Sequence, residues 1–406
     1  MTTLYISYKN VLRTLISGCL LCSGMAYGQN SSDEVLNLIE QNNTQIIAAQ
    51  KTLSATIMDN KTGLNLKNPE VEFEHKWNTR NPGEKGKEVS VTQELEWSVI
   101  SGQKKQLART KNELAEISFR QTRNAILLEA QKKLIEISFC NRMIQELNTQ
   151  LTDADSLVSI YETLLRNGSG NVLDVNRSKL NRAAIATEIR NTNAQKEVLL
   201  QDLYGLNGGN TVSLSPEWSL SPLALPENFD SWFQQMEASV PELNYYQKVL
   251  ELKKKSVRAT KSEMIPSLSV GYTGEFTETE RMQGFAIGMS IPLWENKNKV
   301  KKSKLDVEAA QSTASDARQR VYNSLKTQYV QSVELKKSLQ MQQEALGNLN
   351  TIPLMKEALL KGEINLMVYL NEMTRYYDFR KNLLQTEKDY QTALADLHAF
   401  ELGCVR

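Results

Sequence analysis

The chain has 406 residues, of which 40 % are hydrophobic, and its formal net charge at pH 7 is +1. This charge excludes a strongly basic nucleic-acid-binding protein, and the apolar content excludes a disordered chain. No nucleic acid is expected among the partners.

The first 28 residues predict an export signal that is removed from the mature protein. Lys9 and Arg13 supply positive charge, residues 14–25 (TLISGCLLCSGM) are apolar, and residues 26–28 form a small-x-small cleavage site. Lipoprotein processing is the alternative, because the ISGC tetrapeptide ending at Cys19 has the form of a lipobox and would leave Cys19 acylated. The apolar lead-in before Cys19 is short, which favours cleavage after residue 28.

The mature chain has little disulfide potential and no long apolar segment. After cleavage only Cys140 and Cys404 remain, which is not a disulfide framework. No other stretch reaches the about 18 consecutive apolar residues of a membrane-spanning helix. We therefore expect a periplasmic, secreted or outer-membrane protein.

A helix over residues 33–66 is predicted first, ended by Asn68-Pro69. Two runs of period-two alternation follow, which is typical of strands. In the first run the residues on one face are Val71, Phe73, His75 and Trp77, and in the second they are Val89, Val91 and Leu95. Glutamates occupy most of the opposite face, and residues 81–86 form the connecting loop.

A very long helix is predicted over residues 104–166, which contain neither glycine nor proline. Apolar or small residues recur there at heptad spacing. They are Ile137, Cys140, Ile144, Leu147, Leu151, Ala154, Val158, Tyr161 and Leu165. At about 1.5 Å per residue the helix would be a rod of about 90 to 100 Å. Glycines at 168 and 170 end it, and helix resumes from about residue 172 to about 204.

The same order of elements then returns, about 197 residues further along (Pro69 to Pro266, Trp97 to Trp294). A loop over 205–228 separates the copies. The second copy predicts a helix over 231–263, strands around 268–276 and 287–293, and a rod over 298–361. Pro353 should interrupt that rod near residue 351, and Gly362 marks the second reversal. The expected organisation is a signal (1–28), a first repeat (29–204), an inter-repeat or equatorial region (205–230) and a second repeat (231–406).

No catalytic motif accompanies this architecture. The chain has only two histidines, His75 and His398, and lacks the spacing of a zinc, phosphate-loop, nucleophile-elbow or dinucleotide motif. We therefore expect neither an enzyme, nor a cofactor, nor a metal site.

The four strands have the length needed to cross a membrane, about 9 to 11 residues. A sheet in lipid must close, and the smallest closed barrels have about eight strands. One chain alone cannot close a barrel, so several copies would share it. Aromatic residues at or near the strand ends would form the interfacial girdle: Trp77, Trp97, Tyr272 and Trp294. A small soluble sheet packed on the helices is the alternative.

These features together resemble the TolC-like outer-membrane efflux family over residues 33–403. The resemblance is carried by the reversal motifs LLRNGSGNVLDVNRSKL and LLKGEINLMVYLNEM and by the strand ends VTQELEW and MSIPLW. It implies a mostly helical chain with a small β part. It further implies a homotrimer with a shared 12-stranded β-barrel in the outer membrane of a Gram-negative cell and an α-barrel tunnel in the periplasm.

The resemblance also implies a role for the two reversals. The protein would be the exit duct of a tripartite efflux system, with porin-like activity, docked on a periplasmic adaptor protein and fed by an inner-membrane pump. The residues expected at the docking tips are Gly168, Ser169, Asn171, Val172, Gly362, Asn365 and Leu366. A helical hairpin that reverses in so few residues needs a left-handed backbone position, which Gly168 and Gly362 are expected to supply.

The chain departs from the family at the gate. Members often carry acidic residues six and nine positions after the second glycine, where this chain has Val368 and Asn371. The first repeat has Asp174 and Arg177 at those positions, so Asp174, Arg177 and Asn371 are the gate candidates.

Three functions agree with these features to different degrees. The strand end MSIPLWENKNKVKKSK is similar to that of members serving heavy-metal cation pumps, which favours a duct for cations. A soluble periplasmic coiled-coil scaffold or adaptor would also contain long helical rods, but it would not need four alternating strands that end in aromatic residues. A metal-binding periplasmic protein is disfavoured by the scarcity of ligands.

Overall fold

The computed structural model describes residues 29–77, 79, 85–277, 280–292, 294, 296–347 and 351–402. The predicted export signal with Cys19, and Cys404 near the other end, lie outside these residues. So do most of the predicted loop over 81–86 and residue 293.

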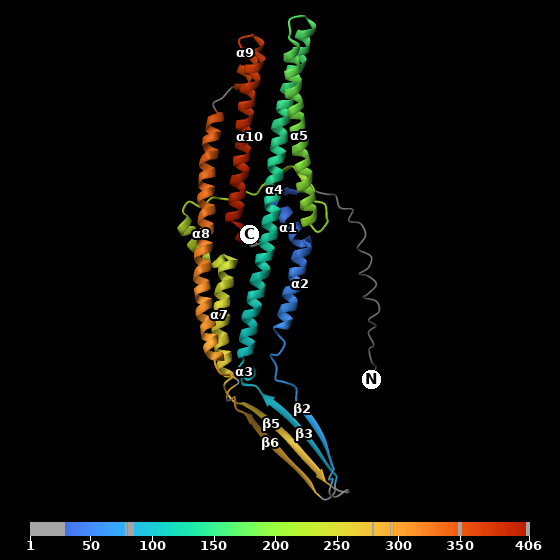
Figure 1. The fold of residues 1–406 in the computed structure, drawn as a ribbon, viewed down its shortest axis with the longest axis vertical. Coiled ribbons are helices and arrows are strands. Elements are labelled where there is room, and N and C mark those ends of the chain that lie inside the picture. The colour runs from blue at the N-terminus through green and yellow to red at the C-terminus, as the bar shows by residue number, and fades with distance from the viewer. Residues whose placement is uncertain are drawn as a thin grey trace, which may run out of the picture.

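The molecule is a long rod with a β-sheet at one end and two helical reversals at the other (Figure 1). Its elements in chain order are β1 (Gln29–Ser31), α1 (Ser32–Asn42), α2 (Thr44–Asp59), β2 (Glu70–Trp77), β3 (Lys85–Leu95), α3 (Trp97–Ile100), α4 (Gln103–Arg166), α5 (Val172–Leu206), β4 (Leu214–Ser219), α6 (Phe229–Met236), η1 (Glu237–Ser239), α7 (Pro241–Ser262), β5 (Ser267–Thr277), β6 (Arg281–Ser290), α8 (Lys299–Gly347), α9 (Thr351–Leu360), α10 (Leu366–Leu397) and η2 (Ala399–Glu401). The predicted mostly helical class with a small β part is confirmed.

The four long strands form one antiparallel sheet in the order β2-β3-β5-β6. Each repeat therefore contributes one hairpin, and the hairpins join through β3 and β5. Val91 pairs with both Val71 and Tyr272, and Tyr272 pairs in turn with Phe285. The outer strands β2 and β6 each have one edge without a partner strand in the described part of the chain.

Helix α4 is the predicted rod, and it packs along α5, α7 and α10. Cys140, Leu147 and Ala154 of the predicted seam are buried. The intervening seam residues Ile144, Leu151 and Val158 are only half-buried, and Met143, Gln150 and Leu157 are buried in their place. The apolar stripe is therefore wider than the contacts within one chain cover, which leaves part of it for another helix.

Three predicted helix or loop segments differ from the structure, and the strand expected around 287–293 is β6, which covers Arg281–Ser290. The helix expected over 33–66 is divided into α1 and α2, and α2 ends at Asp59. The division lies at Asn43, which has an extended backbone. The Asn43 side chain caps α2 by accepting from the N–H groups of Gln45 and Ile46. The helix expected over 231–263 is broken before Pro241, which opens α7 at the position where a missing N–H breaks no helical bond.

The third difference lies between the repeats. The loop expected over 205–228 contains β4, which pairs in parallel with β1. Short strands of six and three residues carry too little alternation to be recognised from sequence.

The predicted interruption of the second rod is confirmed. Helix α8 ends at Gly347 and α9 begins at Thr351, so Pro353 lies in the first turn of a new helix. Helix α9 has 10 residues and buries none of them fully. The second long hairpin is thus less continuous than the first, whose α4 runs unbroken over 64 residues.

Candidate functional site

The two helical reversals lie at the same end of the rod and are built alike (Figure 1). Gly168 follows α4 with a φ of +75°, and Gly362 follows α9 with a φ of +73°. The N–H of Ser169 donates to the Leu164 carbonyl at 3.0 Å, and the N–H of Glu363 donates to the Ala358 carbonyl at 2.9 Å. These are Schellman closures, which require a left-handed residue at the glycine position. The left-handed glycines predicted from sequence are confirmed.

An asparagine begins the return helix in both reversals. The side chain of Asn171 accepts from the N–H of Leu173 at 2.9 Å, and that of Asn365 accepts from the N–H of Val368 at 3.0 Å. Each asparagine follows its glycine by three residues. Both reversals therefore stop one helix and start the next within five residues, which makes them compact and stiff.

The tips expose apolar side chains that nothing in the described chain covers. The exposed ones are Leu164, Leu165, Val172, Leu173, Leu360, Met367 and Val368. Gly168, Ser169, Asn171, Gly362 and Asn365 are exposed as well. Leu366 is the exception among the predicted tip residues, because it is only 4 % exposed and packs inward. Its neighbours Met367 and Val368 take its place on the tip surface.

The gate candidates lie one turn beyond the tips. Arg177 donates to the Asp174 carboxylate of the same helix at 3.2 Å, so the two charges compensate each other locally. Asn371 is exposed, and its side chain makes no hydrogen bond within the described part of the chain. In one protomer these residues do not form a common cluster, and their role as a gate stays a prediction.

Polar contacts that the sequence did not reveal join the two hairpins behind the tips. Arg380 of α10 forms a two-armed ion pair with Glu146 of α4, its Nε lying 2.8 Å from one carboxylate oxygen. The Tyr377 hydroxyl donates to Asp153 of α4 at 3.3 Å. These contacts tie α10 of the second repeat to α4 of the first.

Further ion pairs extend this tie along the rod. Lys132–Asp396 (2.6 Å) and Arg142–Glu387 join α4 to α10, and Lys381–Glu188 (2.6 Å) joins α5 to α10. Such pairs cannot be read from one sequence, because every rod face carries both charges and the pairing depends on helix rotation. The only signal was a basic cluster in α10 facing acidic positions of the first repeat.

A small apolar core surrounds these contacts. Tyr369, Met373 and Tyr377 of α10 are buried against Leu157 of α4. Burial raises the pKa of Tyr369 to about 12, with the nearby Asp153 carboxylate adding to the effect. Burial also raises the pKa of Tyr377, helped by the same carboxylate. Both phenols are therefore neutral throughout the physiological range.

The sheet at the opposite end of the rod has two chemically different faces. Register places on one face the residues Val71, Phe73, Val89, Val91, Leu95, Leu268, Val270, Tyr272, Phe276, Phe285, Ile287 and Met289. Most of them are exposed, and Phe285 reaches 91 %. The other face carries Glu70, Glu72, Glu74, Glu88, Glu94 and Glu275, with Lys76 as its one cation among the described strand residues. This exposed apolar face suits a lipid environment and not water.

The predicted girdle aromatics are distributed over different levels of this sheet. Trp77 ends β2 at the tip far from the helices, whereas Trp97 and Trp294 lie at the helical end. All three are exposed, by 70 %, 47 % and 78 %. Tyr272 differs from the expectation, because it lies in the middle of β5, where its ring contacts Phe285 edge-on.

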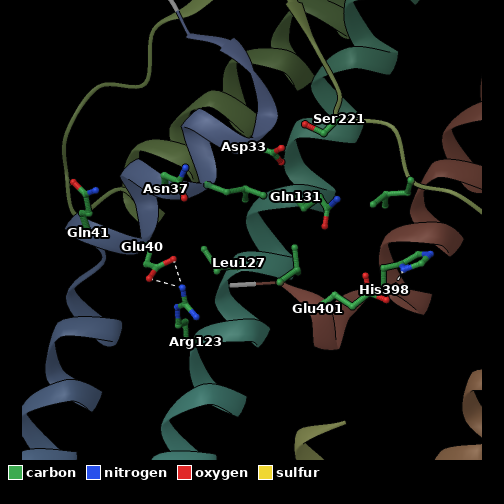
Figure 2. A pocket seen from close by; sticks show the side chains of 13 residues that line it. Asp33, Asn37, Glu40, Gln41, Arg123, Leu127, Gln131, Ser221, His398 and Glu401 are labelled. Carbon is green, nitrogen blue, oxygen red and sulfur yellow. Dashed lines mark hydrogen bonds and ion pairs between the residues drawn. The ribbon is translucent and has the colours of Figure 1, made fainter. Parts of the chain in front are cut away.

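A cavity of about 480 Å³ lies at mid-height between α1, α4 and the C-terminal segment (Figure 2). Asp33, Glu40, Gln131 and His398 are among the side chains that line it. Arg123 closes one side through its ion pair with Glu40, and His398 contacts Glu401 at 2.9 Å. The lining mixes both charges and holds no three metal ligands together; indeed no group of three His, Cys, Asp or Glu suited to a metal occurs among the described residues.

Among the described helices none is both long and apolar enough to cross a bilayer.

Comparison with known proteins agrees with this geometry. The family model of the outer membrane efflux proteins matches residues 232–400, most of the second repeat. The second repeat is therefore similar to the outer membrane efflux proteins, the family that the sequence motifs resemble. No curated protein sequence matches the chain significantly.

Solved structures share the fold of this chain over nearly its whole length. CusC, described through its folding and transmembrane channel formation, matches with a TM-score of 0.75 at 14 % identity, over 92 % of either chain. A membrane protein from Pseudomonas aeruginosa gives 0.74 at 14 % identity, over 91 % of this chain and 89 % of that one. The open state of the MtrE outer membrane channel from Neisseria gonorrhoeae gives 0.71 at 12 % identity, over 91 % and 88 %.

The fold of the chain is thus TolC-like, the fold shared by these outer-membrane channels.

Proposed function

We propose that three copies of the chain form one exit duct of a tripartite efflux system. The observation that carries this proposal is the sheet: one apolar face, one acidic face and two unpaired edges. Four strands cannot close, whereas three copies supply twelve strands, enough for a barrel. The edges β2 and β6 would then pair between neighbours, with the apolar faces toward lipid and the acidic faces toward the bore.

The helical rods support the same stoichiometry. The half-buried residues Ile144, Leu151 and Val158 form an apolar row on α4 that contacts within one protomer leave partly open. Packing against a neighbouring hairpin would bury this row and close a helical tunnel around the same axis.

The tips are the proposed contact with the periplasmic adaptor, and through it with the inner-membrane pump. The two compact reversals expose a small set of apolar side chains on a rigid backbone: Val172, Leu173, Met367 and Val368. An adaptor that ends in a similar helical reversal could bury them without rearrangement of the duct.

A cysteine cross-linking experiment in cells tests this contact. Ser169→Cys, at the first tip, should cross-link to a periplasmic protein with a short thiol-reactive linker. The matched control is Thr149→Cys, an exposed position away from the tip on α4, the helix that leads into this reversal. Equal cross-linking of both variants, or none from Ser169→Cys, would contradict the docking role.

The cargo that we propose for this duct is a cation, of the heavy-metal class. Support comes from the carboxylates of the polar face: Glu70, Glu72 and Glu275 have no ion-pair partner among the described residues. Repeated three times around a bore, they would favour cations over anions.

Planar-bilayer recording tests the preference for cations. Under a salt gradient the trimer should show a cation-selective reversal potential, which the triple variant Glu70→Gln/Glu72→Gln/Glu275→Gln should shift toward zero. An anion-selective channel would contradict the proposal. A cell lacking the protein should lose tolerance to heavy-metal cations before it loses tolerance to neutral compounds.

A further inference from the structure

The apolar face of the sheet ends, away from the helices, in a group of basic side chains. Lys87 of β3 lies between His75 of β2 and Phe276 of β5, and Phe276 lies opposite Arg281 of β6. Lys85, two residues before Lys87, shares its face and pairs with Trp77. We name Lys85, Lys87, Arg281 and His75 the outer basic row.

The outer basic row has no counter-charge in the described chain. Neither Lys85, Lys87 nor Arg281 forms an ion pair with another described residue, and all three are exposed. Lys85 and Lys87 lie on the same face about 7 Å apart, at two residues of strand rise. Like charges at this spacing repel each other, and the repulsion is larger beside lipid than in water.

On the opposite face of the same strands, the charge of a lysine is balanced by carboxylates. Lys76, next to His75 in sequence, points to the polar face and contacts the carboxylates of Glu74 (3.2 Å) and Glu88. Among the described residues, carboxylates thus contact the lysine on the polar face, and none contacts the lysines on the apolar face. An anion from outside the protein would balance the charges of the lysines on the apolar face.

The position of the row identifies the level at which that anion lies. From Leu268 to Phe276 the apolar face extends along eight residues of β5, about 27 Å at 3.4 Å per residue. With strands tilted by about 35–45°, this length rises by about 20 Å, which is close to the apolar band of outer-membrane barrels, about 25 Å tall. The basic row therefore begins where the hydrocarbon of the outer leaflet ends, and Trp77 at the same level is suited to that boundary.

We propose that the outer basic row binds the phosphate groups of a phosphorylated lipid in the outer leaflet. The inference rests on the proposed barrel, which sets the apolar face toward lipid. Arg281 can hold two phosphate oxygens at once, and the two lysines contribute point charges beside it. In a trimer the row occurs three times, and each β6 edge with Arg281 lies beside the β2 edge of a neighbour with His75 and Trp77. The lipid would then bridge the junction between protomers.

Binding of fluorescent lipid A to the purified trimer in neutral-lipid nanodiscs tests this proposal. The variant Lys85→Gln/Lys87→Gln/Arg281→Gln should bind at least tenfold more weakly than the native protein. The matched control Lys76→Gln, from the opposite face of the same sheet end, should bind as the native protein does. Dephosphorylated lipid A should bind the native protein as weakly as native lipid A binds the triple variant.

Each contrary result overturns the proposal. Equal binding by the native and triple-variant trimers would show that the row has no part in lipid contact. Competition by millimolar inorganic phosphate as effective as that by lipid A would show that the row takes free anions instead of a lipid. Failure of the protein to form a trimer at all would instead refute the proposed barrel, and the mass of the nanodisc-inserted protein reports this separately.

Discussion

Gly168 and Gly362 hold the same position in two helical reversals, and the backbone alone explains both. In neither case does any atom lie within 4 Å of the place where a side chain would begin. The glycine is therefore required by its left-handed φ and not by lack of space. A non-glycine residue in this conformation costs about 1–2 kcal/mol.

We predict that Gly362→Ala loosens the second tip. A cost of about 1–2 kcal/mol corresponds to a roughly 5- to 30-fold loss of amide protection. Hydrogen exchange in the last turn of α9 and the first turn of α10 measures it. Gly205→Ala is the matched control: this glycine has an ordinary helical backbone and open space around it, so alanine should preserve or raise protection. Unchanged exchange in Gly362→Ala would contradict the account of the tips.

The ion pair of Arg380 with Glu146 is the residue-scale contact that holds the hairpins together. Its side chains are 35 % and 23 % exposed, and its geometry is two-armed. A double-mutant cycle with Arg380→Ala and Glu146→Ala should give a coupling energy of about 1 kcal/mol, read as local opening of α10 by hydrogen exchange. The exposed pair Arg320–Asp316 is the control and should couple by less than about 0.5 kcal/mol. Equal coupling energies in both pairs would contradict the proposal that the Arg380–Glu146 pair holds the hairpins together.

At the scale of elements, the sheet makes the sharpest prediction. Phe285→Lys places a charge in the middle of the apolar face, at a cost of about 2–4 kcal/mol in each copy. We expect this variant to lose outer-membrane insertion, measured as the folded protein recovered in the membrane fraction. Ala286→Lys, one residue further along on the polar face, should insert normally. Loss of insertion in both variants, or in neither, would contradict the assignment of faces.

Helix α9 is the element expected to open most easily. It has 10 residues and no fully buried side chain, whereas the corresponding end of α4 is part of an unbroken 64-residue helix. Amides of 355–360 should therefore exchange faster than those of 159–164. Slower exchange in α9 would show that Pro353 does not weaken the second hairpin.

The sequence predicted the elements whose patterns are long or paired. The period-two strands, the glycine-free rod of α4 and the left-handed glycines at both reversals were all readable, because each depends on a local rule. The break at Asn43 was missed because an asparagine within a helical pattern cannot be distinguished, from sequence, from an ordinary polar residue on the surface of a continuous helix. The burial of Leu366 depends on tertiary packing, which local patterns do not contain, whereas the mid-strand place of Tyr272 already follows from the strand predicted around 268–276. The ties of Arg380 and Tyr377 to α4 depend on how two rods are rotated against each other.

At the scale of the whole molecule, the duplication gives two hairpins of strands and two hairpins of helices that one chain leaves incomplete. The sheet has unpaired edges, the apolar face is exposed, and the row of Ile144, Leu151 and Val158 is half-covered. A soluble monomeric scaffold would have to leave all three features in water. Association of three copies would pair the strand edges and bury the α4 row by the same symmetry operation, and lipid would cover the apolar face of the sheet.

Native mass spectrometry of the protein extracted from outer membranes tests this central claim most directly. The account predicts a complex of three chains, in the membrane fraction, that persists in mild detergent and dissociates on heating. A monomer recovered from the soluble periplasmic fraction, or a membrane complex of another stoichiometry, would contradict it.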